Sequence, residues 1–164
     1  MNVHRVWRIG SDVDTDALAP GSWMQHGVDV IAQHCLESVR PDFAGAVRPG
    51  DVLIAGRNFG IGSSREQAAA ALRHLGVAAV IAPSYAGLFF RNAFNLGLLL
   101  LTCPGCEVIH EGEKIAFDAR SGTVTRQHGE VLRADPIPPF LLDLVEAGGL
   151  LPQLQRRFQA RTTP

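Results

Sequence analysis

The ten residues from Asn58 to Gln67 read N-F-G-I-G-S-S-R-E-Q and lie between two segments of regular pattern. The apolar run 51–55 before them is typical of a buried strand. Residues 64–75 place apolar side chains on one face, as an amphipathic helix does. In open α/β sheets, ligands bind beyond the carboxyl ends of the strands, where the unpaired N–H groups of a helix attract anions. The stretch therefore predicts either an anion-binding turn or a plain connection from strand to helix.

Several residues of this stretch suit an anionic ligand. Gly62 permits unusual backbone angles and close approach of a ligand, and Ser63 or Ser64 is a natural cap for the helix. Arg65 carries a planar fork of donors for a carboxylate or a phosphate, and Asn58 adds an amide. The spacing differs from a P-loop, from G-x-G-x-x-G and from the nucleophile elbow, so it does not by itself define one ligand.

The rest of the chain alternates strand-like and helix-like segments. Strands are predicted at 5–9, 51–55, 77–82 and 98–101, and helices at 28–38, 64–75 and 85–95. Two further strands are predicted at 113–118 and 122–125, followed by helices at 138–147 and 150–158 and a frayed tail at 160–164. Strand–helix–strand units form parallel sheets. We therefore expect one α/β domain over residues 1–164, with a small mixed or barrel-like sheet and flanking helices.

The composition is that of a globular domain, with 46% hydrophobic residues, 19% charged residues and a net charge of −1. Without a basic excess, neither a nucleic acid nor an anionic membrane surface is an expected partner. No apolar run approaches the roughly 20 residues that span a bilayer, and the amino-terminal residues show no signal-peptide core. The protein is therefore expected to be cytoplasmic, with its cysteines as thiols.

Two other patterns are candidates for metal or redox chemistry. Cys103 and Cys106 form a C-x-x-C pair, which occurs in dithiol redox sites and in zinc sites but also by chance in turns. Asp12, Asp14 and Asp16 alternate like acidic ligands, yet the glycine and the glutamate of a calcium loop do not follow them. We expect a structural turn that places these carboxylates near a ligand, and no metal bound by this chain.

Further segments complete a pattern along the chain; they lie at 12–20, 41–43, 48–51, 82–86, 92–99, 136–138 and 146–150. The first begins D-V-D-T-D and ends in proline, and the segment 92–99 ends in N-L-G-L-L. Together with N-F-G-I-G-S-S-R-E, these segments resemble the swivelling domain of the aconitase superfamily, and most closely the small subunits of the 3-isopropylmalate dehydratase family. The resemblance covers nearly the whole chain and implies a swivelling β/β/α domain.

The resemblance also implies an activity. Family members interconvert 2- and 3-isopropylmalate by dehydration and rehydration in leucine biosynthesis. By that resemblance, Ser63 would be the catalytic base, and Ser64 and Arg65, with Gly62 and Asn58 beside them, would bind a carboxylate of the substrate. The [4Fe–4S] cluster of the family belongs to a separate large subunit, so this chain would act only in complex with that partner.

Two departures from the family pattern are visible. Gln67 stands where the family usually has histidine. Trp23 and Met24 lie where an Arg-Tyr-Leu-like loop usually reads the variable substituent of the substrate, and residues 21–39 contain no arginine or lysine. A third carboxylate would lack an ionic partner there, so an apolar branched substituent is expected, although Trp23 could equally be a core residue. The loop 21–33 is expected to be mobile because its ligand and much of its packing would come from the partner.

The sequence leaves three alternatives open. One is the small subunit of a related hydratase, acting on dimethylmalate, homoaconitate or maleate. Another is a stand-alone module that binds small dicarboxylates with the same glycine, serine and arginine residues. The third is a redox or zinc protein built on the C-x-x-C pair.

Overall fold

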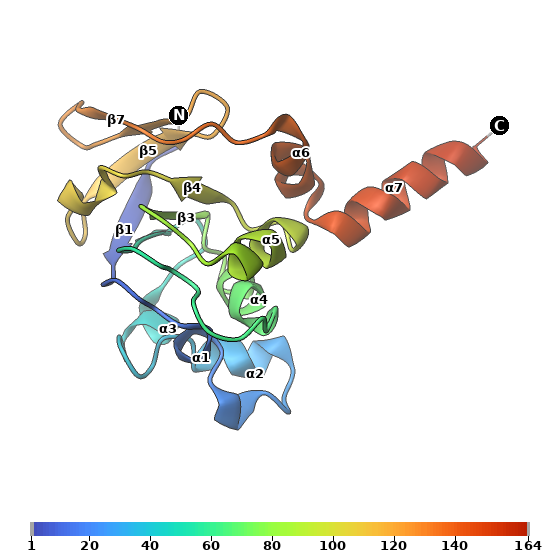
Figure 1. The fold of residues 1–164 in the computed structure, drawn as a ribbon, viewed down its shortest axis with the longest axis horizontal. Helices are drawn as coiled ribbons and strands as arrows, with labels where there is room; N and C mark the ends of the chain where they lie inside the picture. Colours follow the sequence, from blue (N-terminus) through green and yellow to red (C-terminus); the bar gives the residue numbers. More distant parts are fainter. Residues whose placement is uncertain (1, 164) are drawn as a thin grey trace.

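Seven strands in the order β4-β3-β2-β1-β5-β6-β7 form the sheet on which the protein is built (Figure 1). The computed structural model describes residues 2–163. The parallel half of the sheet contains β1 (His4–Arg8), β2 (Val52–Ile54), β3 (Ala79–Ala82) and β4 (Leu100–Thr102). The antiparallel half contains β5 (Lys114–Asp118), β6 (Thr123–Thr125) and β7 (Val131–Arg133). The predicted α/β class with a mixed sheet is confirmed.

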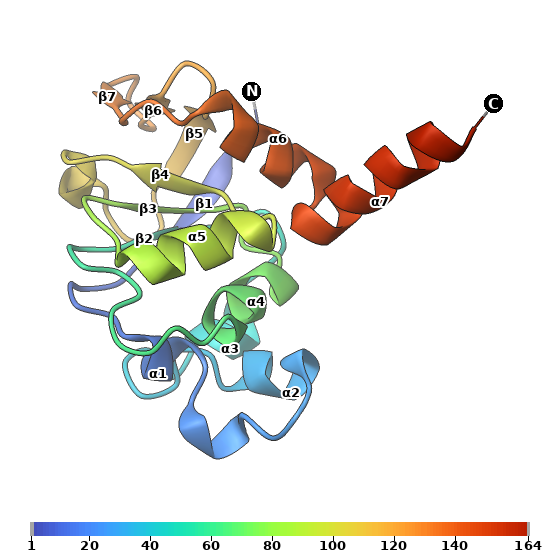
Figure 2. The ribbon, with the colours of Figure 1, turned by 45° about the vertical axis from the view of Figure 1, so that its right-hand side comes forward.

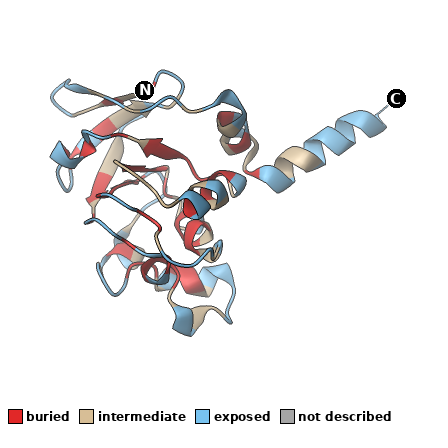
Figure 3. Ribbon diagram, viewed as in Figure 1, coloured by how far each residue is buried: buried red, intermediate tan, exposed pale blue. Residues whose placement is uncertain are grey.

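The helices around this sheet are α1 (Thr15–Leu18), η1 (Gly21–Trp23), α2 (Val28–Gln33), α3 (Phe43–Ala46), α4 (Gln67–His74), α5 (Gly87–Asn95), η2 (Cys106–Val108), α6 (Pro139–Ala147) and α7 (Leu150–Thr162). Figure 2 shows α4 and α5 on the same side of the parallel strands, with α1, α2 and α3 beyond α4. Helix α7 projects from the body and has no buried residue (Figure 3). None of the described helices is long and apolar enough to cross a membrane.

The parallel strands are short and buried. All residues of β2 and β3 are buried, and Leu53 lies opposite Val80 while Ile81 lies opposite Leu101. Continuous apolar runs are typical of parallel strands that are covered on both faces. The loops that follow β1, β2 and β3 are therefore attached to strands that are tightly packed in the core.

Glycines allow the two turns after α5 and α6 to touch backbone to backbone. Gly148 ends α6 with a φ of 87°, a left-handed conformation that favours glycine. A Cβ atom on Gly97 would lie 2.6 Å from the carbonyl carbon of Gly148, and one on Gly149 would lie 2.6 Å from the carbonyl oxygen of Asn95. This contact explains physically why N-L-G-L-L and E-A-G-G-L occur together in the sequence.

The predicted strands correspond to observed ones, but several helix boundaries differ. The helix predicted at 28–38 ends at Gln33, and the helix predicted at 64–75 begins only at Gln67. The last helix continues to Thr162, four residues beyond its predicted end, whereas the fraying expected for 160–164 stays a prediction, and Pro164 lies outside the described residues. Strand β7 and helices α1 and α3 were not predicted, because elements of three or four residues carry too little periodicity.

Asp51 is a buried carboxylate directly before β2, with 6% of its surface exposed. Its Oδ2 atom accepts hydrogen bonds from Arg5 Nη2 at 2.6 Å, from Trp7 Nε1 at 2.9 Å and from the Arg48 N–H at 2.9 Å. Burial alone would raise the pKa of Asp51, but these donors together outweigh burial and hold the pKa below its usual value. The carboxylate thereby joins β1 to the turn that precedes β2.

We expect Asp51→Asn to lower the free energy of unfolding near neutral pH by about 2–3 kcal/mol, because the amide cannot replace a charged acceptor that receives hydrogen bonds from three residues. The folded-state pKa lies below the unfolded value of about 3.9. The stabilising contribution is therefore present above that value and is lost as the pH falls through the folded-state pKa. Urea unfolding near neutral pH and at about pH 3 measures both effects.

The matched control is Asp143→Asn, at an exposed position of α6. This variant should change the free energy of unfolding by less than about 0.5 kcal/mol. Equal stability of the two variants near neutral pH would contradict the role of Asp51.

Candidate functional site

The stretch Asn58–Gln67 forms the connection between β2 and α4, and its backbone pairs with the segment that follows β1. A parallel bridge joins Asp14 and Ile61, and the N–H of Thr15 donates to the carbonyl of Ile61 at 2.8 Å. Because β1 and β2 are adjacent parallel strands, both connections leave the same edge of the sheet. The motif and the D-V-D-T-D segment therefore form one structural unit.

Ser63 is exposed, and its hydroxyl is held by two neighbours. Ser63 Oγ accepts a hydrogen bond from Arg65 Nε at 2.8 Å and lies 3.2 Å from Thr15 Oγ1. Thr15 is only 2% exposed, so its hydroxyl is fixed by packing. The structure thus brings Ser63 and Arg65 together, and it adds Thr15. Sequence reasoning missed Thr15, although its place between Asp14 and Asp16 in D-T-D was a signal.

Arg65 connects the motif to the turn that precedes η1. Its Nη1 atom donates to the carbonyl of Ala19 at 2.8 Å and to Asp16 Oδ1 at 3.2 Å. The same carboxylate oxygen of Asp16 accepts from the N–H of Gly21 at 3.0 Å. Within residues 2–163, Nη2 of Arg65 donates no hydrogen bond. That end of the guanidinium has the geometry and charge to bind a carboxylate.

Asn58 fixes the start of the loop. Its φ of 59° is a left-handed conformation that asparagine tolerates better than most residues. Its Nδ2 atom donates to Asp12 Oδ1 at 2.8 Å, and its backbone N–H donates to Ser84 Oγ at 2.9 Å. The amide group of Asn58 therefore already has a partner in Asp12.

Gly62 lets the backbone pass close to Thr15. Its φ is 104°, and a Cβ atom there would lie 3.2 Å from Thr15 Oγ1. Gly60 is tighter, since a Cβ atom on it would lie 2.2 Å from Phe89 Cγ. Both positions therefore need glycine, because their backbone angles are left-handed and a Cβ atom would crowd a neighbouring side chain. A side chain at Gly62 would also disturb the contact between Thr15 and Ser63.

Neither Ser63 nor Ser64 caps α4, and that prediction is wrong. The residue at the cap position is Glu66, and no side chain makes a capping hydrogen bond. The helix begins later than expected because the chain first continues the loop, in which Ser63 bonds to Arg65 instead. Ser64 is exposed, and its carbonyl accepts from Asn92 Nδ2 at 3.0 Å. Asn92 is a second residue of the site's surroundings that sequence reasoning did not single out.

Trp23 and Met24 are half-buried and pack against the hydrophobic core. Trp23 closes η1, and its ring stacks on the imidazole of His34, with ring centroids 3.8 Å apart and an angle of 5° between the planes. The two interpretations of Trp23, as core residue and as a residue that faces the substrate, are therefore compatible. The mobility expected for residues 21–33 stays a prediction.

Cys35, Cys103 and Cys106 are free thiols and are buried. Burial raises the pKa of all three, that of Cys106 to about 12. Reactive cysteines are partly exposed and have a lowered pKa, so the C-x-x-C pair has the features of a structural pair. In the part of the chain that the structure describes, no group of three His, Cys, Asp or Glu residues could hold a metal. Among the described residues, these buried thiols have no further ligands grouped with them, so they do not fit an iron–sulfur cluster.

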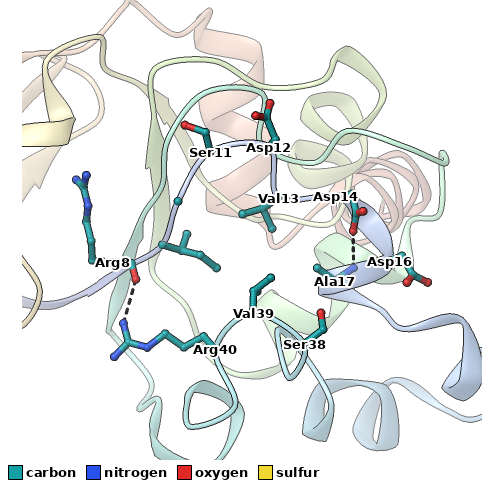
Figure 4. Close-up of a pocket in the computed structure, with 12 residues that line it drawn as sticks. Arg8, Ser11, Asp12, Val13, Asp14, Asp16, Ala17, Ser38, Val39 and Arg40 are labelled. Atoms are coloured by element: carbon teal, nitrogen blue, oxygen red, sulfur yellow. Dashed lines mark hydrogen bonds between the residues drawn. The ribbon is translucent and has the colours of Figure 1, made fainter.

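A pocket of about 390 Å³ lies beside the Asp12–Asp16 segment and is also lined by residues 38–40 (Figure 4). Its charged groups already have partners. Asp14 caps α1, and both Nη atoms of Arg40 donate to Glu111. None of the residues that line this pocket belongs to Asn58–Gln67. The motif, with its available guanidinium nitrogen, is the stronger candidate for an anionic ligand.

Comparison with known proteins identifies the family. Residues 39–105 match the model of the aconitase C-terminal domain. The isopropylmalate/citramalate isomerase small subunit of Methanocaldococcus jannaschii is 40% identical, with 93% of each chain covered. The homoaconitase small subunit of Methanothermobacter thermautotrophicus is 44% identical, with 90% of this chain and 86% of the relative covered. A crystal structure of 3-isopropylmalate dehydratase from M. jannaschii matches with a TM-score of 0.91 at 33% identity, covering 98% of this chain and 96% of the other.

The fold and the loop geometry thus define the swivelling domain of an aconitase-type hydro-lyase. More narrowly, the chain belongs to the family of small subunits of isopropylmalate isomerases and homoaconitases. The resemblance carried by N-F-G-I-G-S-S-R-E is thereby confirmed at the level of the family. The relatives carry several substrate names, so the family alone leaves the substrate undecided.

We expect Arg65→Lys to loosen the turn before η1, because lysine cannot bond to Ser63, Asp16 and Ala19 at once. The backbone N–H of Gly21, which donates to Asp16, should exchange with deuterium about 5–10-fold faster. Amide exchange followed by NMR measures this, with β2 and β3 as internal references.

Arg91→Lys, at an exposed position of α5, is the matched control. It should leave the exchange rate of the Gly21 amide unchanged. Equal rates in the wild type and in Arg65→Lys would show that Arg65 does not hold this turn.

Proposed function

We propose that this chain is the small subunit of a cytoplasmic, heteromeric hydro-lyase that interconverts 2- and 3-isopropylmalate in leucine biosynthesis. The observation that carries the proposal is the network of Thr15, Ser63 and Arg65 at the edge of the sheet. The names of the relatives, all small subunits, support a large-subunit partner. Because the residues of this chain do not fit a [4Fe–4S] cluster, that partner would carry the cluster.

In this proposal Ser63 is the general base that removes the proton from the carbon next to a substrate carboxylate. A serine hydroxyl is a weak base in water, so its anion needs stabilisation. The Nε–H of Arg65, 2.8 Å from Ser63 Oγ, and the hydroxyl of Thr15, 3.2 Å away, both supply donors. Such fixed donors are most effective once water is excluded. Because Ser63 is exposed in this chain, closure by the partner would supply that exclusion.

Arg65 and its neighbours would bind the carboxylate of the substrate. Arg65 uses Nε and Nη1 for its bonds to Ser63, Asp16 and Ala19. Its Nη2 atom has no hydrogen-bond partner among the described residues and is the donor proposed for the substrate carboxylate. The exposed hydroxyl of Ser64 would add a second donor. Asn58, whose amide bonds to Asp12, would act by fixing the loop, and Gly62 by keeping space beside Thr15.

The segment that carries Trp23 and Met24 would contact the variable substituent of the substrate. Arg65 reaches this segment through Ala19 and Asp16, and the chain continues from there directly into η1. Residues 21–39 offer no arginine or lysine. An isopropyl group would pack on Trp23 and Met24 without loss, whereas an extra carboxylate would be buried without a strong cation.

A second candidate is a homoaconitase or citramalate activity of the same site. It is favoured by the relatives of 44% and 40% identity whose names carry those substrates. Both candidates use the same base and the same carboxylate binder. They differ in the substituent, so a panel of isopropylmalate, citramalate and homoaconitate, given to the complex with its large subunit, separates them.

We expect Ser63→Ala, assembled with the large subunit, to lower kcat by at least about 10³-fold with little change in KM, because only the proton transfer is lost. Size-exclusion chromatography should show that the complex still forms. Steady-state kinetics with isopropylmalate measures the effect.

Ser38→Ala is the matched control, since it removes a serine hydroxyl from the pocket of Figure 4 instead of from the motif. This variant should keep wild-type kinetics. Near-normal turnover of Ser63→Ala would exclude Ser63 as the base, and loss of turnover in Ser38→Ala alone would move the site to the pocket.

We expect Trp23→Ala to lower kcat/KM for isopropylmalate by about 10-fold and kcat/KM for citramalate by less, because the larger apolar substituent loses more contact area. Competition between the two substrates measures the ratio directly. Trp23→Phe, which keeps an aromatic ring, should retain most of the preference. An equal loss for both substrates would place Trp23 in the core alone.

A further inference from the structure

The stacking of Trp23 on His34 is the closest contact between two aromatic rings that the structure describes. The ring centroids are 3.8 Å apart and the planes differ by 5°. A second imidazole, that of His26, lies 5.6 Å from Trp23 at an angle of 47°. The orientation of the indole is therefore set mainly by His34, since a parallel stack allows little rotation of either ring.

The position of His34 is fixed by hydrogen bonds of its backbone and of its side chain. It follows α2 as the cap residue, and its N–H donates to the carbonyl of Ile31 at 3.0 Å. Its Nδ1 atom lies 2.6 Å from Glu37 Oε2, a distance at which an Nδ1–H donates to the carboxylate. Two residues later Leu36 is fully buried, and its N–H donates to the carbonyl of Ala17 at 2.8 Å. Glu37 fixes the imidazole ring, and the buried backbone fixes its position.

A chain of contacts connects this aromatic pair to Ser63. Arg65 donates to Ser63 Oγ and to Asp16 Oδ1, and Asp16 accepts from the N–H of Gly21, the first residue of η1. Trp23 is the last residue of the same turn. The turn is thus held at its beginning by the motif and at its end by His34.

We propose that His34 is a positioning residue that determines substrate discrimination by holding Trp23 in its stacked orientation, without touching the substrate itself. The inference rests on the proposed function, in which Trp23 contacts the variable substituent. It follows that the discrimination depends on the flat face and the fixed rotation of the ring at position 34, and that His34 takes no part in proton transfer.

The first test uses the complex with the large subunit. His34→Ala should raise KM for isopropylmalate about 5–10-fold, reduce the preference over citramalate by a similar factor, and leave kcat within about twofold. His34→Phe, which keeps a flat ring, should restore the preference. His128→Ala, at an exposed turn, is the control. A fall in kcat without loss of preference, or a failure of His34→Phe to rescue it, would overturn the inference.

The second test uses the isolated chain and needs no substrate. Acrylamide should quench the fluorescence of Trp23 more strongly in His34→Ala than in the wild type, because the indole becomes more accessible. In His34→Phe the quenching should return to the wild-type value. The buried Trp7 serves as the internal reference. Unchanged quenching in His34→Ala would overturn the stacking role. If the wild-type complex does not convert isopropylmalate, the proposed function fails, whereas this measurement still decides whether His34 positions Trp23.

Discussion

The site depends on one structural constraint, which is that β1 and β2 are adjacent parallel strands whose connections continue to pair beyond the sheet. The hydrogen bond from Thr15 to Ile61 extends the register by one further bridge. This pairing places the D-T-D segment against the glycine-rich motif, although the two lie far apart in sequence. The contact of Ser63 with Thr15 depends on this pairing, because the two residues come from different connections, whereas the bond from Arg65 to Ser63 is local to the motif.

The charges of the protein fall into two groups with different tasks. Asp51 is buried and fully bonded, and Arg40 is paired with Glu111, so these groups stabilise the fold and have little left to offer a ligand. Arg65 differs, because it holds the loop with two of its nitrogens and keeps the third without a partner among the described residues. A guanidinium that is fixed by its neighbours loses little conformational entropy on binding, which favours tight recognition of a carboxylate.

The sequence predicted the sheet better than the details of the site. The parallel strands were recognisable because burial on both faces requires continuous apolar runs such as V-L-I and A-V-I-A. The start of α4 was misplaced because Ser63 and Ser64 look like caps, whereas Arg65 and Thr15 use the hydroxyl of Ser63. His34 could not be found from a local pattern, and Thr15 was indicated only by its place in D-T-D, since the importance of both comes from contacts with residues distant along the chain. The motif itself indicated the correct family, and its glycines are explained by close contacts: a Cβ atom on Gly60 would lie 2.2 Å from Phe89 Cγ, and one on Gly62 would lie 3.2 Å from Thr15 Oγ1.

Family membership leaves the substrate open, because relatives of similar identity carry different substrate names. In the proposed function, the charges around Trp23 would decide it. Residues 21–39 contain two acids, Asp29 and Glu37, and their only groups that can become cationic are imidazoles. The Nδ1 atom of the His34 imidazole is already bonded to Glu37 and is therefore unavailable to a substrate carboxylate. In the proposed function, a third substrate carboxylate near Trp23 would meet an aromatic face, the anion of Glu37 and no arginine or lysine of residues 21–39, so its desolvation would be poorly compensated. An uncharged branched substituent would have no such cost, so in the proposed function the loop would favour apolar substrates by excluding charge as well as by packing.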